Sequence, residues 1–390
     1  MNSNRGFEPS RAYEHTRALC YPRRVGTPRE RRAARYIWRH FTALGLVCER
    51  EPFPVSHFRA EIGTRLAFAV AALSVLFGVI LLPVYPAFAL VCLLLAAVTV
   101  NAPWRLSKLF GTGWPPSTTS HNVLASLPKR PAEAPARVIF MAHYDTKSQL
   151  LPTGVRVALV AGVTALCGVG VLLGVLTLLG HGAASAVPRW IIGIAALVCL
   201  TGLACNVTGN SSPGALDNGS AVGTLLELAR AWRPLAHAPL DVFWVASGAE
   251  EVGLEGARYF LRQRETWWYE KPTLLINLES VGAGSHVYLA GEPRSLQLAR
   301  ASAEALKVPH SRLRVVGAGM DHEPFAARGL AAVTILGDVV RASLALHSAR
   351  DDMRLIDPLA LERAGRLAAH LAWRWAELHA SQPSKGPHAL

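Results

Sequence analysis

The chain has 390 residues, of which 51% are hydrophobic and only 17% are charged. So few charges are unusual for a soluble enzyme and indicate apolar segments that lie in a membrane. The formal net charge is +13, but the arginines are scattered rather than gathered into one block with aromatic residues, so we expect no nucleic-acid partner. Anionic lipid headgroups are the more natural partner for the basic excess.

Neither the cysteines nor the first residues indicate an exported, disulfide-linked protein. The six cysteines include no C-x-x-C pair, so we expect neither a disulfide scaffold nor a zinc site built from cysteine. The opening segment MNSNRGFEPSRAYEHTR lacks the apolar stretch of a signal peptide, and cleavage-dependent export is therefore not predicted.

The first predicted elements are a helix and a strand. Thr27 and Pro28, with Glu30 three residues after the threonine, are typical of a helix start, and apolar residues at helical spacing follow until Gly45. Residues 46–55, LVCEREPFPV, then form a strand candidate.

Two pairs of apolar runs interrupt the polar sequence. Residues 66–82 and 87–100 are separated by PVYP, and residues 157–180 and 190–205 by HGAASAVPR, so each pair is predicted to be a helical hairpin. The run 157–180 would extend about 36 Å as a helix, enough for a bilayer core. Runs 87–100 and 190–205 are short and need flanking residues or partial insertion. Buried core helices of a soluble domain are the alternative, which two charge-free pairs do not favour.

The charges beside these runs predict an orientation. Arg65, Arg105, Lys108 and Arg156 border the polar segments, whereas the hairpin tips carry only Arg189. By the positive-inside rule the polar domain faces the cytoplasm. We therefore expect a multi-pass protein of a bacterial-type inner membrane. The runs contain no charged residue, which argues against a transporter.

The rest of the chain alternates strands and helices. Strands are predicted over residues 121–128, 136–145, 240–251, 273–282 and 331–338, and helices over 220–235, 254–264, 292–306 and 359–380. This order predicts an α/β fold, with a mixed, largely parallel sheet sandwiched by helices and two inserted hairpins. The predicted divisions are 1–63, 105–153 and 208–380 for the polar domain, 64–104 and 154–207 for the hairpins, and a disordered tail at 381–390.

Acids and histidines gather where the buried strands end. In open α/β sheets functional residues lie at the carboxyl ends of strands, and the residues in such positions here are His143, Asp145, Glu250, Glu251 and Glu279. Asp217 opens a helix and His347 follows the last strand. Each alone has a plainer explanation as a solvated strand end, surface charge or helix cap. Their convergence, without cysteine, instead predicts a catalytic zinc site.

The residue types then suggest roles. His143 and His347 would each donate a ring nitrogen to one of two metal ions, with Asp217 bridging the ions and Glu279 and Glu251 completing the two sites. Asp145 would accept the second ring N–H of His143 and fix its tautomer. Glu250 would stay free of metal and take a proton from the attacking water, so the predicted reaction is amide hydrolysis.

The motifs HYD, DNGSAVGTLLELAR, EEVGLEGARYF, NLESVG and HSARDD resemble those of the MH-clan co-catalytic zinc aminopeptidases, a family that includes glutaminyl cyclases. The resemblance covers nearly everything outside the hairpins and implies the same roles for the five ligands and Glu250. It also implies that Asp321, His322 and Phe325 line the substrate side, although Met320 replaces the usual serine. Glu279 stands where many members have aspartate, and the hairpin between Asp145 and Asp217 replaces a short loop.

These features predict a membrane-embedded aminopeptidase with two zinc ions, acting on peptides and anchored in a lipid bilayer. Because both ends of the second hairpin adjoin predicted ligands, we expect substrate to be reached near the bilayer face. The alternatives are a catalytically inactive receptor or scaffold of the same fold, and a single-zinc enzyme like the glutaminyl cyclases. The sequence does not give the oligomeric state.

Overall fold

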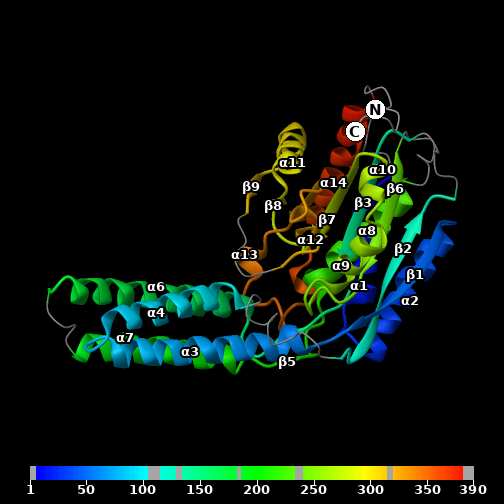
Figure 1. Ribbon diagram of the computed structural model, residues 1–390. Helices are drawn as coiled ribbons and strands as arrows, with labels where there is room; N and C mark the ends of the chain where they lie inside the picture. Colours follow the sequence, from blue (N-terminus) through cyan, green and yellow to red (C-terminus); the bar gives the residue numbers. More distant parts are fainter. Residues whose placement is uncertain are drawn as a thin grey trace. The chain divides into compact units, whose positions relative to one another are not determined.

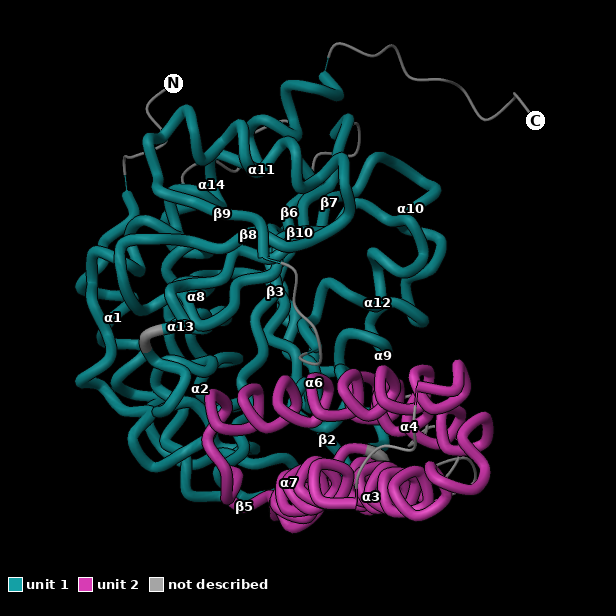
Figure 2. The backbone as a smooth tube through the Cα atoms, turned by 90° about the vertical axis from the view of Figure 1, so that its left-hand side faces the viewer, with its two compact units in different colours: residues 1–55, 118–148, 210–390 teal, residues 56–117, 149–209 magenta. Residues whose placement is uncertain are grey.

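The computed structural model describes residues 6–103, 115–128, 134–181, 186–232, 240–313 and 319–380. The predicted tail at 381–390 and the flanking residues Arg105 and Lys108 lie outside the described residues. The chain divides into two compact units, shown in Figure 2. Unit 1 comprises residues 1–55, 118–148 and 210–390, and unit 2 comprises residues 56–117 and 149–209.

Unit 1 is built on an eight-stranded sheet in the order β1-β2-β6-β3-β7-β10-β8-β9. Its strands are β1 (Val47–Val55), β2 (Thr118–Ser126), β3 (Arg137–His143), β6 (Asp241–Ser247), β7 (Thr273–Glu279), β8 (Val287–Gly291), β9 (His310–Arg312) and β10 (Ala332–Leu336). The four central strands β6, β3, β7 and β10 run parallel, whereas β1, β2 and β8 join their neighbours in antiparallel pairs. The predicted mixed, largely parallel sheet is therefore confirmed.

Helices cover both faces of this sheet (Figure 1). They are α1 (Pro9–Leu19), α2 (Pro28–Ala43), α8 (Ala221–Trp232), α9 (Glu255–Gln263), α10 (Trp267–Glu270), α11 (Pro293–Ala305), α12 (Glu323–Ala326), α13 (Val339–Ala342) and α14 (Pro358–Ala380). Alternate side chains of β3 point to opposite faces, as the two-residue period of a strand requires. Val138 and Phe140 pack in the larger core with α1, α2, α8, α11 and α14, and Ile139 and Met141 pack in a second core with α9 and α12.

The sequence patterns do not predict α1, β8 or β9, for a physical reason in each case. Helix α1 carries polar and charged residues over most of its length and buries only Ala12, Thr16 and Leu19. Strands β8 and β9 are five and three residues long, too short for a period-two pattern to stand out. The edge strand β1 contains Pro52 and Pro54, which an edge position tolerates because it need not donate every ladder hydrogen bond.

Among its described residues, unit 2 contains four apolar helices, α3 (Thr64–Leu81), α4 (Pro86–Asn101), α6 (Thr153–Leu178) and α7 (Ala186–Ala204), with a π-helical turn η1 (Phe58–Gly63) running into α3. Within this unit α3 packs on α4 and α7, and α6 packs on the same two helices. Glycines permit close approach: a Cβ added to Gly193 would lie 2.7 Å from a methyl carbon of Val79. The outer surface is apolar, with Phe77, Phe88 and Ile191 all exposed.

Three of these helical segments are long and apolar enough to span a membrane, with 22, 26 and 19 residues at Ala60–Leu81, Thr153–Leu178 and Ala186–Ala204. The last helix starts four residues before the apolar run predicted from the sequence, which removes its shortfall in length. Helix α4 remains short at 16 residues. A two-stranded ladder of β4 (Ser148–Gln149) and β5 (Thr208–Gly209) joins the two chain segments that lead into and out of the α6–α7 hairpin.

Candidate metal centre

Four predicted site residues follow the ends of three neighbouring parallel strands. β3 ends at His143 and β7 at Glu279, and Glu250 and Glu251 follow within four residues of the end of β6. Because β6, β3 and β7 are adjacent and parallel, their carboxyl ends meet at one edge of the sheet. The backbone there turns sharply: Ala249, Ser280 and His347, each a site residue or next to one, have φ of 56°, 47° and 60°.

Two further site residues come from connections between elements. Asp217 lies in the π-type turn η2 (Ala215–Ser220) just before α8, where its backbone and that of Asn218 depart from helical angles and the peptide bond between them is cis. His347 lies between α13 and the 3₁₀ turn η4 (Met353–Leu355). Asp217 therefore does not open a regular helix, as the sequence pattern suggested; it sits in an irregular turn against the ends of the strands.

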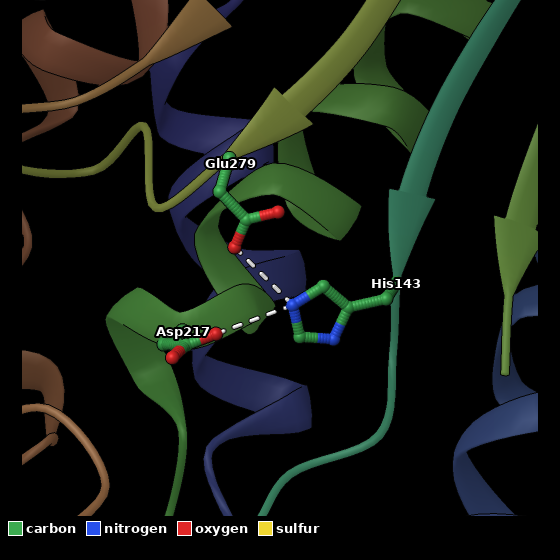
Figure 3. Close-up of side chains that lie close together, drawn as sticks. All are labelled: His143, Asp217 and Glu279. Atoms are coloured by element: carbon green, nitrogen blue, oxygen red, sulfur yellow. Dashed lines mark hydrogen bonds and ion pairs between the residues drawn. The ribbon is translucent and has the colours of Figure 1, made fainter. Parts of the chain in front are cut away.

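His143, Asp217 and Glu279 form one group of possible metal ligands. Figure 3 shows the imidazole of His143 reaching between the two carboxylates. Its Nε2 atom lies 3.2 Å from Oδ1 of Asp217 and 3.2 Å from Oε1 of Glu279. All three residues are buried.

Asp217, Glu251 and His347 form a second group that shares the aspartate. Nε2 of His347 lies 3.1 Å from Oδ2 of Asp217 and 3.2 Å from Oε1 of Glu251. The two oxygens of Asp217 thus belong to different groups, Oδ1 to the first and Oδ2 to the second. A single carboxylate joins both.

The donor atoms fit zinc in both type and spacing. Ligands about 2.0–2.1 Å from a tetrahedral zinc ion lie roughly 3.3 Å from one another, close to the distances between the nitrogen and oxygen atoms here. Oε1 of Glu251 is buried and makes no hydrogen bond of regular geometry among the described residues, although His347 lies beside it. Oε1 of Glu251 and Nε2 of His347 are thus positioned to coordinate the same metal ion.

The pKa shifts of the histidine and aspartate side chains indicate that this cluster stabilises positive charge. Burial disfavours a charged imidazole, but the carboxylates of Glu279 and Glu250 raise the pKa of His143 well above its usual range. Burial likewise disfavours the charged form of Asp217, yet hydrogen bonds from the two histidines hold the pKa of this carboxyl well below its usual range. The buried carboxylates thus favour cations at the positions where metal ions would be held.

Glu250 lies at this centre but belongs to neither group. Its Oε2 atom is 3.9 Å from Nε2 of His143, beyond hydrogen-bond distance. Burial raises the pKa of Glu250 well above its usual range; His143 acts against this shift, and the carboxylate of Glu251 adds to it. A carboxyl group with a raised pKa can take and return a proton near neutral pH.

Asp145 supports the centre in a different way from the one expected. The sequence suggested that its carboxylate accepts a ring N–H of His143, but that oxygen lies 3.6 Å from Nδ1, whereas the backbone carbonyl of Asp145 lies 3.2 Å away. The carboxylate instead accepts hydrogen bonds from the backbone N–H groups of Glu250 and Glu251, both at 3.1 Å. Asp145 therefore fixes the turn that carries Glu250 and one candidate ligand, Glu251.

Replacing Asp145 with Asn is expected to weaken zinc binding by about 10- to 100-fold, the usual effect of losing a group that orients a metal ligand. An amide has one accepting oxygen, so one of the two N–H groups would face an NH₂ group instead. Competition against a chromophoric chelator measures the change. Asp357→Asn, at an exposed helix start, is the matched control. An unchanged zinc affinity in the Asp145 variant would contradict this role.

Three supporting residues were not identified from the sequence. Asp351 is fully buried and accepts hydrogen bonds from the N–H groups of Leu216, at 2.6 Å, and Asp217, at 3.1 Å. Burial, reinforced by the nearby charge of Asp217, raises the pKa of Asp351 to about 7. Its one sequence signal was its place in the motif HSARDD.

The side chains of Asn218 and Lys147 contact two other parts of the candidate metal centre. The side chain of Asn218 donates to the carbonyl oxygen of Leu278, at 3.1 Å, and accepts from the N–H of Ser280, at 2.8 Å, which ties the Asp217 turn to the end of β7. Nζ of Lys147 lies 2.6 Å from Oε2 of Glu251, leaving the other oxygen of that carboxylate toward His347.

Of the three residues expected on the substrate side, two are polar and buried beside the strand ends. Asp321 accepts a hydrogen bond from the hydroxyl of Ser247, and burial raises the pKa of Asp321 to about 7. Nδ1 of His322 lies 2.7 Å from the hydroxyl of Thr334, and burial lowers the pKa of this imidazole to about 4, so it is neutral at neutral pH.

Phe325 does not fit the role expected of it. It is fully buried, with its ring 5.2 Å from that of Trp268 and 6.5 Å from that of Phe260. It belongs to the core between the sheet and helices α9 and α12 and offers no exposed surface to a substrate.

Known proteins resemble the chain in both sequence and fold. Residues 201–372 match peptidase family M28. The aminopeptidase YwaD of Bacillus subtilis strain 168 is 31% identical over 170 residues, which cover 40% of this chain and 36% of the relative. The chain thus spans about a third of the curated relative it matches.

Solved structures share the fold at low identity. A zinc aminopeptidase from Bacillus subtilis has a TM-score of 0.57 at 15% identity, covering 94% of this chain and 95% of its own. An aminopeptidase from Aneurinibacillus sp. strain AM-1 has a TM-score of 0.56 at 16% identity, with 94% of each chain covered. The glutaminyl cyclase of Porphyromonas gingivalis has a TM-score of 0.53 at 16% identity, covering 95% of this chain and 98% of its own.

Proposed function

We propose that this chain, whose residues 201–372 match peptidase family M28, is a membrane-embedded aminopeptidase with two zinc ions. The observation that carries the proposal is the pair of ligand groups joined by Asp217, each with one histidine nitrogen and two carboxylates. The choice of N-terminal cleavage draws on the aminopeptidase relative, whose matched part is 31% identical.

The residues divide into ligands and a base. His143 and Glu279 would hold one zinc ion, His347 and Glu251 the other, and Asp217 both. Bound there, two zinc ions would supply Lewis acidity toward the scissile carbonyl and make a nucleophilic water available at neutral pH. Oε2 of Glu250 accepts the proton of the attacking water and returns it to the departing amine. Asp145 and Asp351 keep the ligand-bearing turns in place through their backbone hydrogen bonds.

The membrane part of the proposal rests on unit 2. Three of its helical segments are long and apolar enough to span a bilayer, and they expose many large apolar side chains. Positive charge at Arg65 and Arg156 favours a cytoplasmic peptidase unit by the positive-inside rule. In intact cells, an impermeant thiol reagent should then leave Cys20 and Cys48 unlabelled; labelling of either from outside would reverse the orientation.

Metal content and hydrolysis test the enzymatic proposal. The purified chain should carry two zinc ions and release nitroaniline from aminoacyl-4-nitroanilides, and chelation should lower that rate at least about 100-fold, since the proposed chemistry depends on the metal. Added zinc should restore the rate. Substrates with an acetylated N-terminus are the control, because an aminopeptidase needs the free amine.

Other outcomes would replace the proposal. Cyclisation of an N-terminal glutaminyl peptide with one zinc ion bound, and no aminoacyl hydrolysis, would make the chain a glutaminyl cyclase instead. Two bound zinc ions without either activity would favour a receptor or scaffold. A chain that binds no transition metal would contradict the metal centre itself.

A further inference from the structure

Helix α2 carries an arginine-rich outer face. Its inner side buries Ala33, Ala34, Ile37 and Phe41. Because a helix repeats every 3.6 residues, the positions between them point outward together. Those outer positions hold five exposed arginines, which we call the arginine face of α2: Arg29, Arg31, Arg32, Arg35 and Arg39.

This face has a large unbalanced charge. The one acid in α2, Glu30, is buried, and its carboxylate accepts hydrogen bonds from Gly26 and Ser120 inside unit 1. Some exposed arginines elsewhere do have an acidic neighbour, as Arg328 does in Glu265. Across the described residues, no carboxylate lies within salt-bridge distance of the arginine face. Five like charges within about three helical turns, without acidic partners, suggest a binding partner outside the unit.

The start of α2 lies beside the point where the chain passes between unit 1 and the α3–α4 hairpin. Unit 1 is interrupted after Val55 and resumes at Thr118, and these two residues pair across β1 and β2. Gly26, two residues before α2, packs so closely on Thr118 that an added Cβ would lie 2.7 Å from its hydroxyl oxygen. Val55 is three residues before the helical turn that runs into α3.

The residues just before α2 also contact the points where the chain leaves unit 1 for the α6–α7 hairpin and returns from it. The N–H of Arg24 donates to the side chain of Asn210, at 3.1 Å, and that of Arg23 to the hydroxyl of Thr146, at 2.9 Å. Unit 1 is interrupted after Ser148 and resumes at Asn210. The four residues at which the chain leaves or re-enters unit 1 are Val55, Thr118, Ser148 and Asn210. These crossings therefore lie next to the segment that leads into α2.

Only a few residues separate the crossings at Ser148 and Asn210 from the ends of the apolar helices. Helix α6 starts five residues after Ser148, and α7 ends six residues before Asn210. A residue spans at most about 3.5 Å, so these two crossings lie within roughly 20 Å of an apolar helix end. If the apolar helices lie in a bilayer, the crossings are near its headgroups. This step rests on the proposed membrane insertion.

We propose that the arginine face of α2 binds the phosphate groups of acidic phospholipids and so fixes how the peptidase unit lies on the membrane. Guanidinium groups suit phosphate, because they donate paired hydrogen bonds and never lose their charge near neutral pH. The half-exposed Trp38 lies on the outer side of the same helix, and tryptophan is enriched at the headgroup level of membrane proteins. A cytoplasmic leaflet rich in acidic lipid attracts clustered basic residues.

Lipid binding by the full-length chain tests this proposal. In detergent, native mass spectrometry of the wild type titrated with phosphatidylglycerol or phosphatidylcholine should show a clear preference for the acidic lipid. The variant R29Q/R32Q/R35Q/R39Q should bind phosphatidylglycerol at least about fivefold more weakly and phosphatidylcholine unchanged. Its hydrolysis of aminoacyl substrates in detergent should equal that of the wild type, since none of the four residues belongs to the metal centre.

A matched control removes the same charge elsewhere. R262Q/R294Q/R300Q/R312Q neutralises four exposed arginines of α9, α11 and β9 and should keep the preference for phosphatidylglycerol. The milder R35Q/R39Q should give an intermediate loss, which keeps the proposal testable if the fourfold variant folds poorly. Equal lipid binding by wild type and the α2 variant, equal losses in both fourfold variants, or displacement of the lipid by an RNA oligonucleotide at equal phosphate concentration would overturn the proposal.

Fractionation separates this failure from failure of the proposed membrane insertion. Wild-type protein in the soluble fraction of lysed cells would contradict insertion, whereas membrane-bound protein whose lipid preference ignores the arginines would contradict only the role of α2.

Discussion

Replacing Glu250 with Gln is expected to lower kcat/KM for aminoacyl substrates by about 100- to 10,000-fold, the range that a positioned proton-transfer group contributes. The amide keeps the size of the side chain but cannot accept the proton of the attacking water. Because Glu250 belongs to neither ligand group, bound zinc should stay at two ions per chain. Steady-state kinetics and elemental analysis of the same sample measure both quantities.

Glu255→Gln is the control for this substitution, since it makes the same change five residues later at the start of α9. It should retain the wild-type kcat/KM. A Glu250 variant with full activity would show that another group takes the proton. A variant that loses zinc along with activity would make Glu250 a ligand and not a base.

Replacing Asp217 with Asn should have the largest effect, because one carboxylate serves both ligand groups. An amide has one accepting oxygen and no charge, so we expect weaker binding of both zinc ions and a loss of more than about 1,000-fold in kcat/KM, as the whole metal-dependent rate is affected. Since a ligand stabilises the state that binds it, the zinc-dependent rise in melting temperature should also shrink. Elemental analysis and thermal melts with and without zinc check both expectations.

His347→Asn and Glu279→Gln are the comparisons for Asp217→Asn, because each belongs to a single group. Each should remove one zinc ion and leave the other. An Asp217 variant that still binds two zinc ions at wild-type affinity would show that the aspartate does not bridge them.

The fold could be predicted because the sheet centre imposes strong patterns. Strands β3, β6 and β7 are buried along their whole length and therefore appear as continuous apolar runs. The polar residues at their ends stood out against those runs, so His143 and Glu279 could be named. The metal-binding roles of these residues remain predictions.

The remaining features depend on contacts that a linear pattern does not contain. Asp351 acts through backbone N–H groups more than 130 positions away, which no local spacing reveals. Phe325 was placed on the substrate side because it follows a polar motif, but an apolar residue beside such a motif can equally face the core, as it does here. The predicted boundary at residue 63 falls inside a helical stretch, because η1 and α3 are continuous.

The division of unit 1 into three chain segments has a consequence for the order of synthesis. Its central strand β3 is made after the first apolar hairpin and before the second, whereas β6, β7 and β10 all come after both. The sheet therefore cannot assemble around β3 until both hairpins have left the ribosome. Asp217, Glu251, Glu279 and His347 also all follow the second hairpin in the sequence. The proposed metal centre therefore cannot form until both hairpins have been made.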